Sequence, residues 1–328
     1  MKVFVTRKIP EEGLQILKDA GHVVEMWQQN SPMSHNELLA KTKNVDAVIT
    51  SLSDKIGADF FENNPSLKIV SNYRPSFSNF DISIANKFKI PLTYTPKVNH
   101  DAVAEFTFGL ILALARHIPA AHKYTNEGNF KYYDPMQFRG TLLKGKTLGI
   151  VGMGNIGSRL GKMCAKAMDM NVLYYDESVE NTFDFSVKSV DLEILLQSSD
   201  VISIHLPPVP SSNGRIGHNE MKSMKDGVLL INTSLAKSLN QSALLQNLRS
   251  KKIAGAAIDL VTEETLSDYE ASSFREFSDL SNVIITPQIS SSTFETRDEM
   301  SRMVAADILR VFNGEQAQYI INPEIYTS

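Results

Sequence analysis

Residues 146–157 read KTLGIVGMGNIG, a short apolar run that leads directly into three glycines spaced G-x-G-x-x-G. The apolar run predicts a buried strand, and a helical pattern follows the glycines. Gly152 allows a tight turn, Gly154 lets the backbone approach a pyrophosphate, and Gly157 lets the helix pack on the strand. A strand, turn and helix in this order predict a Rossmann domain whose helix N-terminus holds the phosphates of a dinucleotide.

An acidic residue follows at the position where a ribose-binding carboxylate is expected. Asp176 ends the next strand-like run, roughly 20 residues beyond Gly157, which suits a hydrogen bond to the ribose 2′-hydroxyl. A carboxylate there repels a 2′-phosphate, and Glu177 adds a second acid. We therefore expect NAD(H) in preference to NADP(H). A glycine turn kept only for packing is the less favoured alternative, because strand, turn, helix and acid occur together.

Strand-like runs alternate with helical patterns on both sides of this turn. Before it, the strand candidates are residues 2–5, 23–26, 47–50, 67–71 and 91–93. From the turn onward they are residues 147–151, 172–175, 201–206, 228–232, 254–260 and 283–286. Strands separated by helices pair in parallel, so we predict an α/β protein with two doubly wound parallel-sheet domains. A last helix, predicted over 292–312, is expected to return to the first domain.

Composition limits the classes of function. A chain of 328 residues is longer than one hydrophobic core usually serves, and its net charge of −4, without a long basic run, does not suggest a nucleic-acid or anionic-membrane surface. The single cysteine, Cys164, excludes an internal disulfide. We expect no signal peptide, no metal site and a cytoplasmic location, because neither a leader-like start nor a metal-ligand spacing occurs.

Several strings resemble one family, the D-isomer-specific 2-hydroxyacid dehydrogenases, and in particular the glyoxylate and hydroxypyruvate reductases. Besides the glycine turn they are VFVTRKIP at 3–10, DAVAE at 101–105, HLP at 205–207 and KIAGAAID at 252–259. The resemblance covers essentially the whole chain. It implies a flavodoxin-like substrate domain, residues 1–100 plus 291–328, split by an NAD-binding Rossmann domain, residues 101–290. It also implies a homodimer built on a long helix that the sequence predicts over 101–123.

The turn and the resemblance together assign ten residues to the cofactor site. They are Gly152, Gly154, Asn155, Ile156, Gly157, Asp176, His205, Pro207, Thr233 and Asp259. His205 is expected to be a neighbour of the cofactor rather than a catalytic group. Trp27, Tyr132 and Tyr133 are expected to serve packing.

The resemblance also implies three catalytic side chains, and two of them are replaced. The family's arginine holds the substrate's carboxylate and carbonyl, its histidine is the general acid/base, and its glutamate orients that histidine. Here Leu235 stands at the arginine position and Gln288 at the histidine position, while Glu264 keeps the glutamate. Leucine cannot hydrogen-bond a carboxylate, and glutamine does not titrate, so the usual mechanism is not expected. Without an imidazolium to orient, Glu264 is as well explained as a solvated loop acid.

Three cationic residues are candidate replacements. Arg74 lies in a loop where the family has a glycine-rich carboxylate grip, and its guanidinium suits a carboxylate or phosphate. Pro75, which follows it, has no N–H to offer. Lys97 replaces a usual glycine, and His100 could donate a proton. Exposed hinge residues unrelated to a ligand are an equally good interpretation of these three positions.

Two classes of function follow. The favoured one is an NAD-dependent oxidoreductase of the D-2-hydroxyacid dehydrogenase type that acts on a small 2-oxo or 2-hydroxy acid, or an analogue, at a non-standard site. The alternative is an NAD(H)-binding pseudoenzyme with a regulatory or scaffolding role. A non-redox reaction that uses bound NAD stays open as a third possibility.

Overall fold

The computed structural model describes residues 1–178, 182–259, 275–277 and 279–327. These residues form two compact units. The first unit contains residues 1–99 and 292–327, and the second contains residues 100–259 and 275–291. Each unit is built on its own parallel sheet, and the prediction of two doubly wound α/β domains is confirmed.

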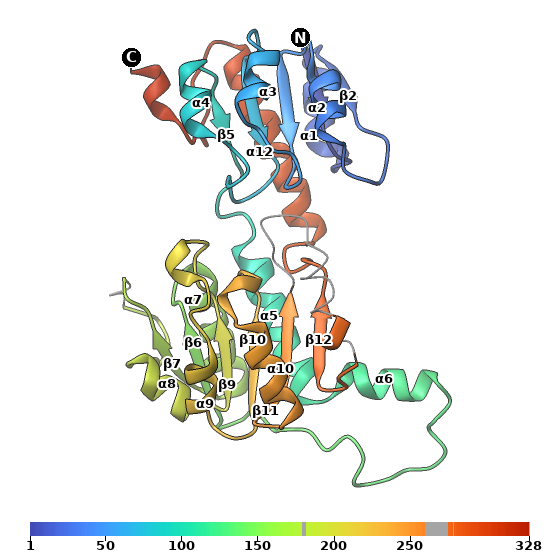
Figure 1. The fold of residues 1–328 in the computed structure, drawn as a ribbon, viewed down its shortest axis with the longest axis vertical. Helices are drawn as coiled ribbons and strands as arrows, with labels where there is room; N and C mark the ends of the chain where they lie inside the picture. Colours follow the sequence, from blue (N-terminus) through green and yellow to red (C-terminus); the bar gives the residue numbers. More distant parts are fainter. Residues whose placement is uncertain (179–181, 260–274, 278, 328) are drawn as a thin grey trace. The chain divides into compact units, whose positions relative to one another are not determined.

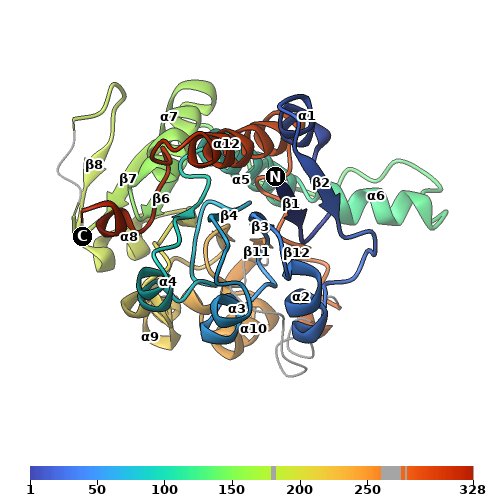
Figure 2. The same cartoon turned by 90° about the horizontal axis from the view of Figure 1, so that it is seen from above.

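The sheet of the first unit has the strand order β2-β1-β3-β4-β5, which is the flavodoxin-like order. Its strands are β1 (Lys2–Val5), β2 (Val23–Met26), β3 (Ala47–Thr50), β4 (Ile69–Asn72) and β5 (Leu92–Thr93). Figure 2 shows α1 (Glu11–Asp19) and α12 (Phe294–Phe312) side by side along this sheet. The other helices are α2 (His35–Thr42), α3 (Ala58–Asn63) and α4 (Ile82–Lys87), which pack on the opposite face. β3 and β4 are buried at every residue, which explains why they begin with apolar runs and lack the alternation of a half-exposed strand.

The sheet of the second unit has the order β12-β11-β10-β9-β6-β7-β8. Its strands are β6 (Thr147–Val151), β7 (Asn171–Tyr175), β8 (Lys188–Ser189), β9 (Val201–Ile204), β10 (Val228–Asn232), β11 (Ile253–Asp259) and β12 (Val283–Thr286). One face is covered by α5 (His100–Ala115) and α7 (Asn155–Met168), and the other by α8 (Leu192–Ser198), α9 (His218–Ser223) and α10 (Gln241–Arg249) (Figure 1). The strand order reverses between β6 and β9, and ligands of such sheets bind at the carboxyl ends of the strands there.

The long helix predicted over 101–123 is wrong as a single element. The chain forms α5 and then α6 (Ile118–Asn126), and the two helix axes are bent by 62°. The break lies at His117, whose φ of 54° is left-handed, and Pro119 stands in the first turn of α6. Proline fits the first turn of a helix, where its missing N–H costs nothing, so it starts a second helix here. Among the described helices, none is alone long and apolar enough to cross a membrane; only this bent pair, taken together, has the length and composition.

Candidate functional site

The glycine turn has the geometry that its sequence predicts. Gly152 has a φ of +96°, and a Cβ placed there would lie 2.4 Å from the His205 carbonyl oxygen. A Cβ on Gly157 would lie 2.3 Å from the Gly152 carbonyl oxygen. Both glycines are therefore required by close backbone contacts. The third, Gly154, has no atom within 4 Å of the place where a Cβ would stand, so this glycine keeps space open above the turn.

The start of α7 completes a cradle that fits a dinucleotide phosphate. Gly154 is the N-cap of this helix and has no side chain with which to bond its first N–H groups. Asn155 and Ile156, the first two residues of α7, present backbone donors beside the open space at Gly154. Free N–H groups and the positive end of a helix of 14 residues favour an anionic group at this point.

Asp176 lies beside the turn and is held in place by backbone donors. Its Oδ2 accepts a hydrogen bond from the Met153 N–H at 2.7 Å. Its Oδ1 accepts from the backbone N–H and the hydroxyl of Ser178, at 2.9 and 3.0 Å. These bonds orient the carboxylate at the end of β7, and Oδ2, which accepts only one of them, keeps a further lone pair with which a ribose hydroxyl can bond.

Glu177, the second acid, accepts hydrogen bonds from two side chains that belong to no recognised motif. Its Oε1 accepts from the Tyr175 hydroxyl at 2.6 Å and from an Arg215 nitrogen at 3.0 Å. Arg215 also donates to the Tyr175 oxygen at 2.7 Å, and its guanidinium carbon lies 5.6 Å from the centre of that ring. Sequence reasoning missed Arg215, because it belongs to no recognised string and is brought to the end of β7 only by the fold.

His205 follows β9 on the other side of the strand-order reversal. Its backbone N–H donates to the Val151 carbonyl at 2.8 Å, which joins the ends of β6 and β9. Its ring nitrogen Nε2 lies 2.9 Å from the Ser203 hydroxyl. The residue is half-buried, and desolvation of the ring lowers its pKa to about 4. At neutral pH the ring is therefore uncharged, as suits a structural neighbour of the turn; Pro207, two residues further, is exposed.

The segment after β10 places Leu235 by hydrogen bonds from buried neighbours. The Asn232 side chain donates to the Leu235 carbonyl at 3.1 Å and accepts from the Ser234 N–H at 3.0 Å. The Thr233 hydroxyl lies 2.9 Å from that of Thr107 on α5. Leu235 itself is half-buried and precedes the short 3-10 helix Ala236–Ser238. The backbone around the family's arginine position is thus firmly built, although an aliphatic side chain occupies it.

Asp259 organises the loop that carries Gln288. Its Oδ1 accepts from the Thr286 hydroxyl at 2.7 Å and the Ile289 N–H at 3.0 Å, and its Oδ2 accepts from the Ser290 N–H at 2.9 Å. Gln288 lies between these donors with a left-handed φ of 57°. The fully buried carboxylate therefore fixes the backbone on both sides of the acid/base position. Its assignment to the cofactor stays a prediction.

The remaining catalytic candidates fall in different parts of the chain. Arg74 is half-buried in the loop after β4, where its carbonyl accepts from the Thr95 N–H at 2.8 Å. Lys97 is exposed and has a left-handed φ of 62°, the conformation that a glycine would adopt easily. Both belong to the first unit, whereas His100 begins α5 in the second. Their grouping around one ligand stays a prediction, and Glu264 lies outside the described residues.

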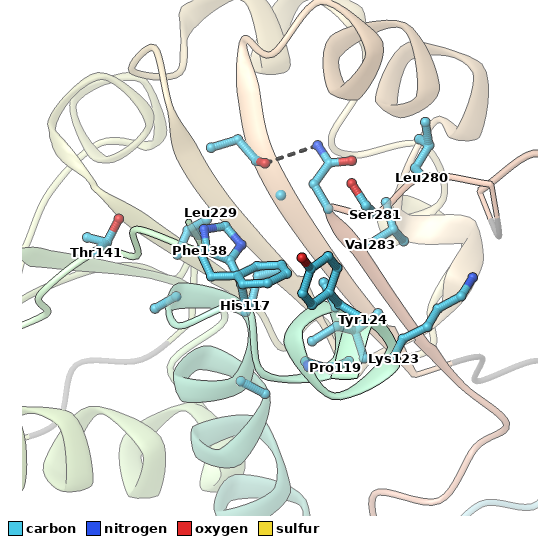
Figure 3. Close-up of a pocket in the computed structure, with 18 of the residues that line it drawn as sticks. His117, Pro119, Lys123, Tyr124, Phe138, Thr141, Leu229, Leu280, Ser281 and Val283 are labelled. Carbon is cyan, nitrogen blue, oxygen red and sulfur yellow. Dashed lines mark hydrogen bonds between the residues drawn. The ribbon is translucent and has the colours of Figure 1, made fainter. Parts of the chain in front are cut away.

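A cavity of about 620 Å³ opens at the amino ends of the strands of the second sheet (Figure 3). Leu229, Gly255 and Val283 line it near the amino ends of β10, β11 and β12. Its other wall includes Tyr124 and Phe138, whose ring centres lie 5.5 Å apart. The cavity is therefore separate from the glycine turn, which follows the carboxyl end of β6.

Comparisons with known proteins agree with this geometry. Residues 108–290 match the family model described as the NAD-binding domain of D-isomer-specific 2-hydroxyacid dehydrogenases. The chain is 38% identical to a glyoxylate reductase of Thermococcus litoralis over 100% of its own length and 98% of that protein. A glyoxylate reductase of Thermofilum pendens is 37% identical over 99% and 95%. Among solved structures, the TT0316 protein of Thermus thermophilus is similar with a TM-score of 0.90 and 30% identity, over 98% of this chain and 100% of that one.

Proposed function

Because the chain belongs to the D-isomer-specific 2-hydroxyacid dehydrogenases, we propose that it transfers a hydride between NAD(H) and C2 of a small 2-oxo or 2-hydroxy acid, or a close analogue. The observation that carries this proposal is the open space above Gly154, next to the first N–H groups of α7. The relatives are named for an oxidoreductase activity, and this favours an enzyme over the alternative of a pseudoenzyme.

The preference for NAD(H) is supported by the residue at the end of β7. Asp176 is held by three hydrogen bonds beside the turn, where its negative charge disfavours a 2′-phosphate. When bound, the dinucleotide supplies or accepts the hydride, while the residues of the chain must bind the acid and manage its proton.

The substrate groups must be held differently from the family's usual way. Leu235 offers an apolar contact where an arginine would donate two hydrogen bonds, and each charge-assisted bond is worth about 1.5–3 kcal/mol. Gln288 can donate a hydrogen bond to a substrate oxygen but cannot deliver a proton. We propose that Arg74 binds the substrate carboxylate and that His100 gives the proton. Glu264 keeps its family position in the sequence.

A substrate panel tests the proposal. Purified protein with NADH and a range of small 2-oxo acids should oxidise NADH with at least one of them, measured by the loss of NADH absorbance. Arg74→Ala and His100→Ala should each lower that rate by about 10²-fold or more, because a positioned carboxylate anchor or proton donor is lost. Arg249→Ala, at an exposed residue that ends α10 and pairs with Glu276, is the matched control and should leave it unchanged. Leu235→Arg combined with Gln288→His should raise glyoxylate reduction by about 10²-fold or more.

The outcomes separate the alternatives. Tight NADH binding without turnover across the panel would support the pseudoenzyme. An activity that neither Arg74→Ala nor His100→Ala changes would remove these two residues from the mechanism. A protein that binds no nicotinamide nucleotide would contradict the proposal as a whole.

We further propose that the protein is a homodimer whose contact surface includes α6 and residues 127–142. This segment exposes large apolar side chains: Ile118, Phe130, Tyr132, Tyr133, Met136 and Leu142. Tyr132 and Tyr133, which are expected to serve packing, are 75% and 81% exposed in the single chain. These exposed side chains belong to a segment that lines the cavity of Figure 3 at Glu127 and Phe138, and their exposure favours coverage by a second copy. The cytoplasmic location stays a proposal.

A further inference from the structure

We propose that Arg215 is a latent binding group for the 2′-phosphate of NADP(H), and that Glu177 and Tyr175 keep it engaged and unavailable for that ligand. The inference rests on the proposed use of NAD(H). It adds a specificity-determining cluster to the carboxylate that the sequence already indicated. The cluster consists of Tyr175, Glu177 and Arg215.

The position of the guanidinium carries the first step. Arg215 reaches the residue directly after Asp176, because one of its nitrogens lies 3.0 Å from Glu177 Oε1. The same nitrogen lies 2.7 Å from the Tyr175 hydroxyl. A cation beside the ribose carboxylate is the feature by which Rossmann domains accept a 2′-phosphate. This chain therefore contains an NADP-type cation bound to the residue that directly follows its NAD-type carboxylate.

The hydrogen bonds around Glu177 carry the second step. Its Oε1 accepts from both the phenol and the guanidinium, so much of its charge is compensated by a partner 3.0 Å away. The bond to Glu177 raises the pKa of Tyr175, and the phenol thus keeps the proton that it donates. The main role of Glu177 is then to hold Arg215, and its own charge adds little to the repulsion of a 2′-phosphate. Repulsion of a 2′-phosphate falls mainly to Asp176.

Because the cluster is exposed to solvent, Arg215 can exchange its bond to Glu177 for a bond to a ligand. The side chains of Arg215 and Glu177 are 37% and 74% exposed, so solvent and ligand can reach both. A bidentate phosphate is a stronger partner for a guanidinium than one solvent-screened carboxylate oxygen. Once the repulsion from Asp176 is removed, the choice between Glu177 and a 2′-phosphate should decide how tightly NADP(H) binds.

A double-mutant cycle in an Asp176→Asn background tests this proposal. Dissociation constants of NADPH and NADH are measured by nucleotide fluorescence for D176N, D176N/E177Q, D176N/R215Q and the triple variant. Glu177→Gln should tighten NADPH binding at least about tenfold when Arg215 is present, and less than about threefold when it is Gln. NADH binding should stay within about threefold throughout, which also shows that the variants fold. Glu276→Gln, which breaks the similarly exposed pair with Arg249, should leave both constants unchanged.

Two results would overturn the inference. An equal gain from Glu177→Gln in both backgrounds would mean that Glu177 acts by its charge alone. A loss of NADH affinity on Arg215→Gln as large as the loss of NADPH affinity would make Arg215 a general contact of the nucleotide. If the unmodified protein binds neither nucleotide, the proposed function itself fails, and that result is distinct from the other two.

Discussion

The imidazole of His205 is kept neutral in the folded protein, although it stands at the edge where an anionic cofactor is expected. Desolvation lowers its pKa from 6.5 to about 4. Between these two values the unfolded chain binds a proton that the folded chain does not. The resulting stabilisation is fully present above pH 6.5 and is lost as the pH falls towards 4.

We predict a stability difference that disappears on His205→Gln. At about pH 5 the unmodified protein should lose up to about 2 kcal/mol more unfolding free energy, relative to about pH 7, than the variant does, because glutamine does not titrate. The figure is an upper bound, since the residue is only half-buried. Urea unfolding followed by circular dichroism at both pH values measures it. Equal losses for the two proteins would show that His205 is solvated in the folded state.

At the scale of elements, the first unit is closed by a helix from the far end of the chain. Gly13, in the first turn of α1, donates its N–H to the Ser301 hydroxyl of α12 at 3.0 Å. That hydroxyl donates in turn to the Pro10 carbonyl at 2.7 Å. A Cβ on Gly13 would lie 1.9 Å from the Ser301 carbonyl oxygen, so the two helices touch backbone to backbone.

Gly13→Ala should therefore destabilise the first unit although alanine is the better helix former. The clash between backbones should cost about 1–3 kcal/mol, which exceeds the gain in helix propensity of at most about 1 kcal/mol. Ser301→Ala removes the hydrogen bonds without a clash and should cost about 1 kcal/mol. The fluorescence of Trp27, which is buried in this unit, reports both transitions. A Gly13→Ala protein as stable as the unmodified one would refute the close contact.

The sequence predicts the bounds of buried strands better than helix breaks or contacts between distant side chains. Buried strands are continuous apolar runs, and β6 and β10 have the predicted bounds for that reason. The break between α5 and α6 was missed because a left-handed φ, as at His117, is uncommon for any residue other than glycine, and Pro119 was not taken as the start of a second helix. The contacts of Arg215 and the hydrogen bonds that Asp259 accepts from residues 286–290 were missed as well. Their partners are distant in the sequence, and only the sheet order brings them together.

At the scale of the whole molecule, the second sheet carries two separate features, one at each end of its strands. The carboxyl ends of β6, β7 and β9 carry the glycine turn, Asp176 and His205. The amino ends of β10, β11 and β12 border the cavity beside α6. The segment that exposes large apolar side chains, residues 118–142, lines this cavity at Glu127 and Phe138. Coverage by a second copy would remove these apolar side chains from water without covering the carboxyl ends of β6, β7 and β9.

Replacing two of these side chains should separate the copies. The unmodified protein should sediment at twice its chain mass of 36.5 kDa, and Tyr132→Asp with Tyr133→Asp should raise the dimer dissociation constant about 100-fold or more. Burying two new carboxylates in an apolar contact is costly, and aromatic residues are frequent hot spots of interfaces. Phe294→Asp is the matched control, because this aromatic residue is 87% exposed but lies in the first unit. Sedimentation velocity over a range of concentrations measures all three proteins. A double variant that stays dimeric would place the contact on another surface. NADH binding retained by a monomeric variant would show that cofactor binding does not depend on the dimer contact.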